Sequence, residues 1–192
     1  MRRFAAMLRD TSGATAAEFA LTIPILVVFL LGIMDVGFYA WAINRSEKAT
    51  QMGARYAVVT DLVPANLASY SFASSGEVPQ GTTVPQNLFP TVTCTSTTCT
   101  QWGHDPAAFA NILARMRMFD NSIEADNVRI EYSWSGLGYA GDPNGPDVAP
   151  IVTVRLVNMQ HTPIFTLLVG TVDLPEFAYS LTAEDSDGDR SN

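Results

Sequence analysis

Cys94 and Cys99 are the only cysteines of the chain, and they lie in a segment rich in threonine and serine. Two cysteines this close together favour a small disulfide in an oxidising compartment. Such a bond would close a loop of four residues, so its entropic contribution to stability would be small. With His104 and His161 the pair is loosely compatible with a zinc site, but we favour the disulfide because exported cysteines oxidise.

Three further patterns could do chemistry, and we interpret each of them as structural. The sequence GLGYAG at 136–141 matches the glycine pattern of dinucleotide-binding turns, yet the following DPNGPD cannot begin the helix that such a site needs. Asp185, Asp187 and Asp189 resemble part of a calcium loop that lacks its downstream glutamate. The two histidines lie in no recognisable catalytic setting. We therefore expect no enzyme, no cofactor and no metal.

Glu18 is the most informative ionisable residue, because it stands at the start of an apolar run. The stretch reads SGATAAEFALTIPILVVFLL, and from Phe19 to Ile43 the only charged residue is Asp35. A carboxylate inside a bilayer costs ~2.5–3.5 kcal/mol on insertion scales, so it is retained where something pairs with it. The alternative is a solvated glutamate at the membrane interface that has no role.

The run from Phe19 to Ile43 is long enough for a transmembrane helix, which needs about 20 residues. The alternative is a buried core helix of a soluble protein, but such helices seldom contain a run like IPILVVFLLGIM that no polar residue interrupts. Pro24 should kink this helix, and Asp35 lies near its far end, where the carboxylate can reach the interface or a partner. A removable signal peptide, cut after Ala40-Trp41-Ala42, is the alternative, but the apolar core exceeds the usual ~7–15 residues.

The residues around Gly13 resemble a known family. The sequence from SGATAAEFALTIPIL to GARYAV looks like the amino-terminal region of TadE-like pseudopilins, the minor pilins of tight-adherence (Flp-type) type IV pili. In that family a basic leader ends in glycine, a prepilin peptidase cuts after it, and the mature chain has glutamate at its fifth position, followed by an aromatic residue. With Ala14 as mature residue one, Glu18 and Phe19 take these two places. The resemblance is strong across 9–60 and weaker beyond.

The resemblance implies a role for these residues. In related pilins the new terminal amine pairs with a glutamate of a neighbouring subunit, and we expect the same of Ala14 and Glu18. An uncleaved leader would remove this amine, so proteolysis would license assembly. Because many type IV pilins begin with phenylalanine, methylation of Ala14 stays open. The partners implied are the prepilin peptidase, the major Flp pilin, other minor pilins, the inner-membrane assembly platform and the lipid bilayer.

Charge constrains partners more than it constrains orientation. The net charge is −8, and basic residues are not clustered beyond the first few positions, which argues against nucleic acid. Three basic residues flank each end of the apolar run, so the positive-inside rule does not favour either orientation of the helix in the membrane. Family leaders are cytoplasmic, which implies a single-pass protein of the bacterial inner membrane. Its head, after about residue 44, would lie outside the cytoplasm. The surface pilus is a second location implied for the protein.

We expect a pilin-like α+β fold with a long amino-terminal helix and a small antiparallel sheet packed with one or two helices. Residues 1–13 would form the leader, 14–60 the transmembrane and stalk helix, 61–182 the extracytoplasmic head and 183–192 an acidic, solvated tail. The stalk would be about 70 Å long at about 1.5 Å per residue. A separate short helix after a break at Gly53 is the alternative.

Periodicity predicts the elements of the head. Residues 64–104 are rich in Thr, Ser, Pro and Gly and indicate loop with short strands at most. The sequence HDPAAFANILARMRMFD indicates a helix with Asp105 as N-cap and Pro106 at its first position. Its apolar stripe consists of Phe109, Ile112, Leu113 and Met116.

Three strands follow, and each alternates between apolar and polar residues. The residues expected on one face are Val128, Ile130, Tyr132 and Trp134, then Val152, Val154 and Leu156, then Phe177, Tyr179 and Leu181. A long Gly/Pro-rich hairpin loop would join the first two strands. Thr162-Pro163 would open a short apolar helix or turn around IFTLLVG.

These features predict a minor pilin or pseudopilin of a Tad (Flp) type IV pilus system, cut after Gly13 and needed for pilus assembly or adherence. The competing class is a single-pass, membrane-anchored extracytoplasmic binding module that joins no filament. A third is a secreted enzyme released at Ala42.

Overall fold

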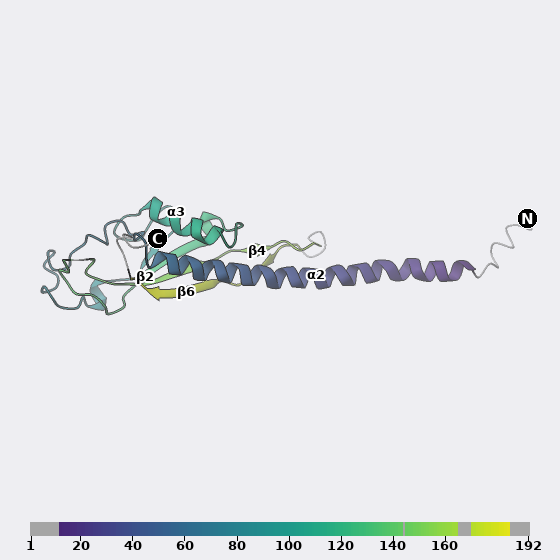
Figure 1. The fold of residues 1–192 in the computed structure, drawn as a ribbon, viewed down its shortest axis with the longest axis horizontal. Helices are drawn as coiled ribbons and strands as arrows, with labels where there is room; N and C mark the ends of the chain where they lie inside the picture. Colours follow the sequence, from purple (N-terminus) through teal and green to yellow (C-terminus); the bar gives the residue numbers. More distant parts are fainter. Residues whose placement is uncertain (1–11, 144, 165–169, 185–192) are drawn as a thin grey trace, which may run out of the picture. The chain divides into compact units, whose positions relative to one another are not determined.

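The computed structural model describes residues 12–143, 145–164 and 170–184. Its helices are α2 (Ser12–Ala57) and α3 (Pro106–Arg117), with short 3₁₀ turns η1 (Gln86–Leu88) and η2 (Ala125–Asn127). Its strands are β1 (Val92–Cys94), β2 (Val128–Ser133), β3 (Ile151–Leu156), β4 (Gln160–His161), β5 (Val172–Asp173) and β6 (Phe177–Thr182), as Figure 1 shows. The predicted α+β class, with a long apolar helix before a small antiparallel sheet and a further helix, is confirmed.

The chain divides into two compact units. We call Met1–Trp41 with His161–Val172 the helix unit, and Ala42–Gln160 with Asp173–Asn192 the head unit. The first part of α2 belongs to the helix unit and its last 16 residues, Ala42–Ala57, belong to the head unit.

Helix α2 is continuous over 46 residues, and it runs through both Pro24 and Gly53. The alternative of a break at Gly53 is therefore wrong, and the predicted end at Thr60 lies three residues beyond the observed end. Pro24 has no backbone N–H, so it cannot donate the helical hydrogen bond to the carbonyl of Ala20. The helix tolerates this loss without ending.

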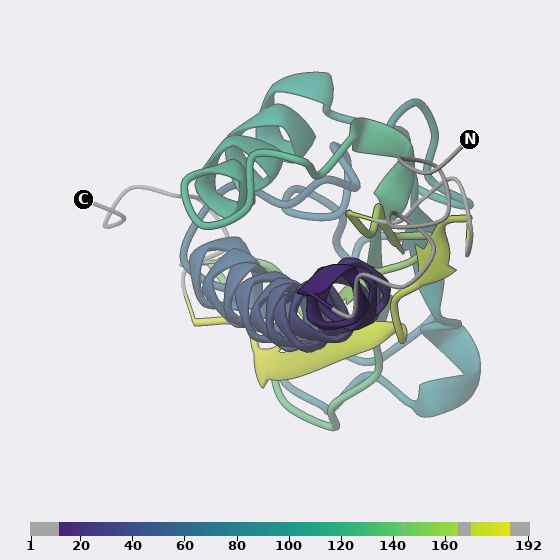
Figure 2. The same ribbon diagram turned by 90° about the vertical axis from the view of Figure 1, so that its right-hand side faces the viewer.

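Within the head unit, α2 buries a face made of small side chains. The buried positions on this face are Ala42, Ser46, Ala49, Thr50, Gly53, Ala54 and Ala57. A Cβ atom added at Gly53 would lie 2.6 Å from Cγ of Met116 and 3.5 Å from Cγ1 of Val154. Small residues thus let α3 and β3 approach the helix closely, and Figure 2 shows α3 and β6 on either side of this part of α2.

Helix α3 begins as the sequence predicts. The carboxylate of Asp105 accepts hydrogen bonds from the backbone N–H groups of Ala107 (2.8 Å) and Ala108 (3.1 Å), and Pro106 takes the first helical position. These bonds satisfy two of the donors that a helix start leaves unpaired. The four residues of the predicted apolar stripe, Phe109, Ile112, Leu113 and Met116, are all buried.

Four antiparallel strands form the main sheet, in the order β1-β2-β3-β6. Ile130 pairs with Val154 and Tyr132 with Val152, so the apolar residues of β2 and β3 share one buried face, as predicted. On β6, an edge strand, Phe177, Tyr179 and Leu181 are only half-buried. The other edge strand, β1, lies in the segment 64–104, for which the sequence indicated loop with short strands at most.

The first predicted strand is shorter than the sequence indicated. Trp134 was expected on its apolar face, but β2 ends at Ser133, and the indole N–H of Trp134 donates to the backbone oxygen of Val84 at 2.8 Å. The strands β4 and β5 pair in a two-stranded sheet, one strand before and one after the segment IFTLLVG, for which the sequence suggested a short apolar helix or turn. Residues 165–169 of that segment lie outside the described residues. The same holds for 185–192, which include most of the predicted acidic tail.

A buried carboxylate ties α2 to the segment after α3 in the head unit. The side chain of Asp120 is 0% exposed, and it accepts hydrogen bonds from the hydroxyl of Ser46 (3.0 Å) and the backbone N–H of Ser122 (3.1 Å). Nη2 of Arg45 lies 3.1 Å from its Oδ1, and the side chain of Arg45 is 26% exposed. Burial of a charge is unfavourable unless it is paired and hydrogen-bonded, and Asp120 meets both conditions.

The variant Asp120→Ala should lower the free energy of unfolding of the head unit by about 3 kcal/mol, because it removes one partner of a buried ion pair together with several hydrogen bonds. Urea unfolding of the full chain in detergent micelles, followed by tryptophan fluorescence, measures this loss. Glu47→Ala is the matched control, since Glu47 is an exposed acid of α2 that bonds Gln51, and its effect should stay within about 0.5 kcal/mol. Equal losses in the two variants would contradict this role of Asp120.

Candidate processing and assembly site

The predicted processing site lies in the first turn of α2. Gly13 is exposed, and a Cβ atom added to it would meet no atom within 4 Å. Ala14 follows it within the same turn. A protease must reach the bond that it cuts, and the described residues place nothing over Gly13.

Glu18 and Phe19 follow within two turns of the helix start, and both are exposed. The hydroxyl of Thr22 donates to the backbone oxygens of Glu18 (3.0 Å) and Phe19 (3.2 Å), so these contacts use the main chain of Glu18. Within the described part of the chain, no hydrogen bond or ion pair involves the Glu18 carboxylate. Its side chain is therefore available to a group from outside this chain.

Spacing along the helix relates Glu18 to the predicted new terminus. Residues four apart lie on the same side of an α-helix, so Glu18 projects from the face that begins at Ala14. If the helix began at Ala14, Glu18 would lie near its positive end, where a negative charge is stabilised by about 0.3–1 kcal/mol. The same end would then carry the terminal amine.

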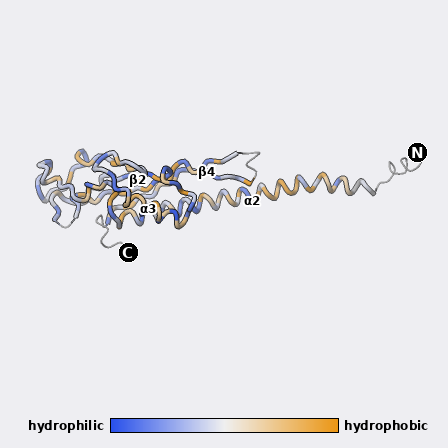
Figure 3. Tube along the Cα trace, turned by 90° about the horizontal axis from the view of Figure 1, so that it is seen from above, coloured by the Kyte–Doolittle hydropathy of each residue, from blue (hydrophilic) through white to orange (hydrophobic). Residues whose placement is uncertain are grey.

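The helix unit exposes apolar side chains on every side of α2. Figure 3 shows the hydrophobic colouring continuing along this part of the helix. The large exposed side chains are Phe19, Leu21, Ile23, Ile25, Leu26, Val27, Val28, Phe29, Leu30, Ile33, Met34, Val36, Phe38 and Trp41. Among the described residues, this is the one helix long and apolar enough to cross a membrane. A helix that is apolar all round belongs in a protein core or in a bilayer, and these side chains are not in a core.

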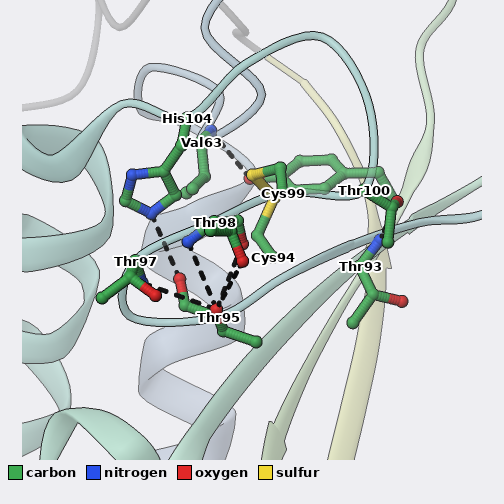
Figure 4. Close-up of a disulfide and its surroundings, with 10 residues drawn as sticks. Val63, Thr93, Cys94, Thr95, Thr97, Thr98, Cys99, Thr100 and His104 are labelled. Atoms are coloured by element: carbon green, nitrogen blue, oxygen red, sulfur yellow. Dashed lines mark hydrogen bonds between the residues drawn. A yellow bond between two sulfur atoms is a disulfide. The ribbon is translucent and has the colours of Figure 1, made fainter.

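The two cysteines are joined in a disulfide, as the sequence predicts. Cys94 is the last residue of β1, and Cys99 forms an isolated bridge with it across the turn. Figure 4 shows the imidazole of His104 directed to the backbone of Thr95, with Nε2 3.1 Å from the carbonyl oxygen. Both sulfur atoms are used by the bond, so the zinc alternative lacks its thiolates. In the described ranges no group of three His, Cys, Asp or Glu residues could hold a metal ion.

Tyr132 of β2 pairs with Val92 of β1, and its side chain bonds the loop that follows α2. Its phenolic oxygen accepts a hydrogen bond from the backbone N–H of Val63 at 3.1 Å, and the side chain is fully buried. Burial raises the pKa of Tyr132 above its ordinary value, because the charged phenolate would lose its hydration. The phenol therefore stays neutral and acts as a structural hydrogen-bonding group.

The GLGYAG segment is a structural loop. Gly136, Gly138 and Gly141 have positive φ angles, and a Cβ atom at Gly138 would lie 2.5 Å from the backbone oxygen of Asp147. The buried carboxylate of Asp147 accepts hydrogen bonds from the backbone N–H groups of Phe72 (2.7 Å) and Asp142 (3.1 Å). No helix follows in the described residues, so the nucleotide-binding motif lacks its context. Asp185, Asp187 and Asp189, the weak calcium pattern, lie outside those residues.

Two carboxylates important to the structure were not identified in the sequence as contact residues. Asp120 and Asp147 are both buried in the head unit. Neither forms a motif with its neighbours in sequence, because the partners of Asp120 on α2 lie more than 70 positions away and Phe72 lies 75 positions from Asp147. Long-range partners of this kind leave no local pattern.

The comparison with protein families agrees with the resemblance noted in the sequence. The family model described as TadE-like protein matches residues 13–55. These residues are TadE-like. The matched segment covers less than a quarter of the chain and contains Gly13, Ala14, Glu18 and Phe19. No curated protein and no solved structure matches the chain.

The TadE-like match has general consequences for function. It suggests a protein associated with the Tad pilus, and the family is one of pilus components that is not known for enzymatic activity. It also implies partners within a pilus system. The apolar amino-terminal helix fits single-pass membrane anchoring.

Proposed function

We propose that this protein is a minor pilin or pseudopilin of a Tad (Flp) type IV pilus system. In this proposal a prepilin peptidase cuts after Gly13, and the processed chain is needed for pilus assembly or adherence. The observation that carries the proposal is the TadE-like segment, which begins at Gly13 and contains the exposed Glu18 at the fifth position after it.

The proposed organisation follows from the processing site and the apolar helix. Residues 1–13 form the leader, 14–60 the transmembrane and stalk helix, 61–182 the extracytoplasmic head and 183–192 the tail. The amino terminus lies in the cytoplasm and the head lies outside the inner membrane. The Cys94–Cys99 disulfide supports this orientation, because disulfides persist in oxidising compartments and are rare in the cytosol.

Glu18 supplies the physical basis for assembly. A carboxylate within the bilayer costs ~2.5–3.5 kcal/mol, and the Glu18 side chain has no partner in the described part of its own chain. Cleavage after Gly13 creates a positively charged amine on Ala14. Pairing this amine with Glu18 of a neighbouring subunit neutralises both charges where water is scarce. Before cleavage the amine does not exist, so assembly waits for the peptidase.

The remaining partners follow from the same scheme. Phe19 and the other apolar side chains of α2 contact lipid before assembly and neighbouring pilin helices after it. The major Flp pilin, other minor pilins and the inner-membrane assembly platform supply these neighbours. The head unit then acts as an initiator, adaptor or cap of the filament.

The mature amino terminus distinguishes this proposal from its alternatives. Mass spectrometry of the protein isolated from membranes or pili should give a chain that begins at Ala14. A chain that begins at Met1 would instead support the anchored binding module, and a chain that begins at Ile43 would support secretion after a signal peptide. Gly13→Leu should block processing and leave the leader in place.

The variant Glu18→Ala should leave cleavage after Gly13 intact and reduce the number of assembled pili by at least about tenfold, since ~1.4 kcal/mol of lost pairing equals a tenfold change. Electron microscopy and quantitation of sheared pili measure the effect in cells whose only copy is the variant. Glu47→Ala, an exposed acid later on the same helix, is the control and should assemble normally. Normal piliation with Glu18→Ala would refute the pairing role.

A further inference from the structure

Four aromatic rings from the loops between α2 and α3 gather in the head unit. Phe72 and Phe89 are buried, whereas Tyr70 and Trp102 are half-exposed. The indole of Trp102 stacks on Phe89, with ring centroids 5.3 Å apart and an angle of 20° between the planes. Tyr70 meets Phe72 and Trp102 edge to face, with centroids 4.8 Å and 6.0 Å away. The two buried rings thus support the two that reach the surface.

These two surface rings line a groove of the head unit. Tyr70 and Trp102 share it with the polar side chains of Glu77, Asn87 and Gln101, and its volume is about 490 Å³. This volume lies within the range of about 300–1,000 Å³ that small-molecule sites occupy. Among the described residues that line the groove, none is lysine, arginine or histidine. The groove therefore offers a ligand aromatic surface, amides and one carboxylate, and no positive charge.

The polar groups of the groove have unused hydrogen-bonding capacity. Oε2 of Glu77 accepts hydrogen bonds from the hydroxyls of Tyr70 and Ser75, both at 2.9 Å, which holds the carboxylate beside the Tyr70 ring. In the part of the chain that the structure describes, no hydrogen bond uses Oε1 of Glu77 or the side-chain amides of Asn87 and Gln101. Each amide provides both donors and an acceptor. Donors and acceptors thus stand next to the aromatic rings.

Trp102 is held in a backbone conformation that large side chains rarely adopt. Its φ angle is 57°, in the left-handed region that is unfavourable for a residue with a bulky side chain. Hydrogen bonds fix this segment, since the backbone N–H of Asn66 donates to the oxygen of Trp102 at 2.8 Å and that of Thr100 to the oxygen of Thr93 at 3.0 Å. Such strained residues cluster at ligand-binding sites. A ring that is already fixed also loses less entropy when a ligand binds.

This combination of groups matches the chemistry of an uncharged sugar. The C–H groups on one face of a pyranose ring pack against an aromatic ring, and its hydroxyls, which both donate and accept, bond amides and carboxylates. Without a cationic lining residue, the groove disfavours sugars that carry a carboxylate or a phosphate. A quaternary ammonium ion is also attracted by aromatic rings and a carboxylate, but it would leave the amides of Asn87 and Gln101 unused.

We propose that this groove is a carbohydrate-binding site for an uncharged pyranose sugar. Trp102 and Tyr70 provide the surface on which the sugar ring packs. The hydroxyls of the sugar bond the side chains of Glu77, Asn87 and Gln101. The inference concerns the head unit alone, so it does not depend on processing after Gly13 or on pilus assembly.

Saturation-transfer difference NMR tests the site on the full chain in vesicles of phosphatidylglycerol, which carry neither sugar nor choline. The probes are the methyl pyranosides of glucose, galactose, mannose and N-acetylglucosamine. We expect at least one of them to bind with a Kd on the order of 1 mM, which is ordinary for a ligand of this size. Saturation should be strongest on the C–H protons of one face of the ring.

Two results with these probes would overturn the proposal. The first is no saturation of any of the four sugars. The second is saturation of choline chloride, measured in the same vesicles, without saturation of any sugar, because it would make the groove a site for cations.

Substitutions in the groove test where the sugar binds. Asn87 is exposed, so Asn87→Ala should keep the fold and raise the Kd about tenfold through the loss of a hydrogen bond. Gln86→Ala is the matched control, since Gln86 is an exposed amide that precedes Asn87 and is not among the residues that line the groove. Trp102→Ala should abolish binding, and Trp102→Phe should retain part of it. Equal Kd values in Asn87→Ala and Gln86→Ala would overturn the site.

Discussion

Apolar side chains on every side of α2 favour an apolar environment over water, and the amino-terminal part of the chain depends on this constraint. From Phe19 to Trp41 most of the large apolar side chains of α2 are exposed, and each is worth about 1.5–3 kcal/mol when it is fully removed from water. Within such a helix each carboxylate needs a partner. Asp35 has the backbone N–H of Ile164, whereas the side chain of Glu18 has no partner among the described residues of its own chain. This contrast makes Glu18 the residue for which we propose a partner on a neighbouring chain.

The same helix changes character after Trp41. In the head unit its buried face consists mostly of Ala, Ser, Thr and Gly, and Gly53 allows Met116 of α3 and Val154 of β3 to approach closely. Large side chains on this face would force α3 and the sheet apart, because a packed core has little free space. One continuous helix therefore presents large apolar side chains in one part and small ones in the other. The TadE-like segment, residues 13–55, covers both parts.

Elements with a local signal were predictable from sequence. Asp105 and Pro106 marked the start of α3, and strict alternation marked β2 and β3, because cap chemistry and side-chain periodicity act over a few residues. The edge strand β1 carried a weaker signal, since its three residues lie in a long stretch rich in Thr and Ser. Residues around Gly13 could be assigned as a candidate site because leader, glycine and glutamate are close in sequence. The contacts of Asp35, Asp120 and Asp147 could not, since each joins segments far apart in the chain.

The central claim is that the amine of Ala14 pairs with the carboxylate of Glu18 on a neighbouring chain. Carbodiimide treatment joins an amine and a carboxylate that are in direct contact, and trypsin then releases the segment from Ala14 to Arg45. Mass spectrometry of assembled pili or membrane assemblies should detect two such peptides joined through Ala14 of one copy and Glu18 of the other, and Glu18→Gln should abolish the product. Assembled filaments that yield only unlinked or internally linked peptides, under conditions that crosslink other amine–carboxylate pairs, would contradict the account.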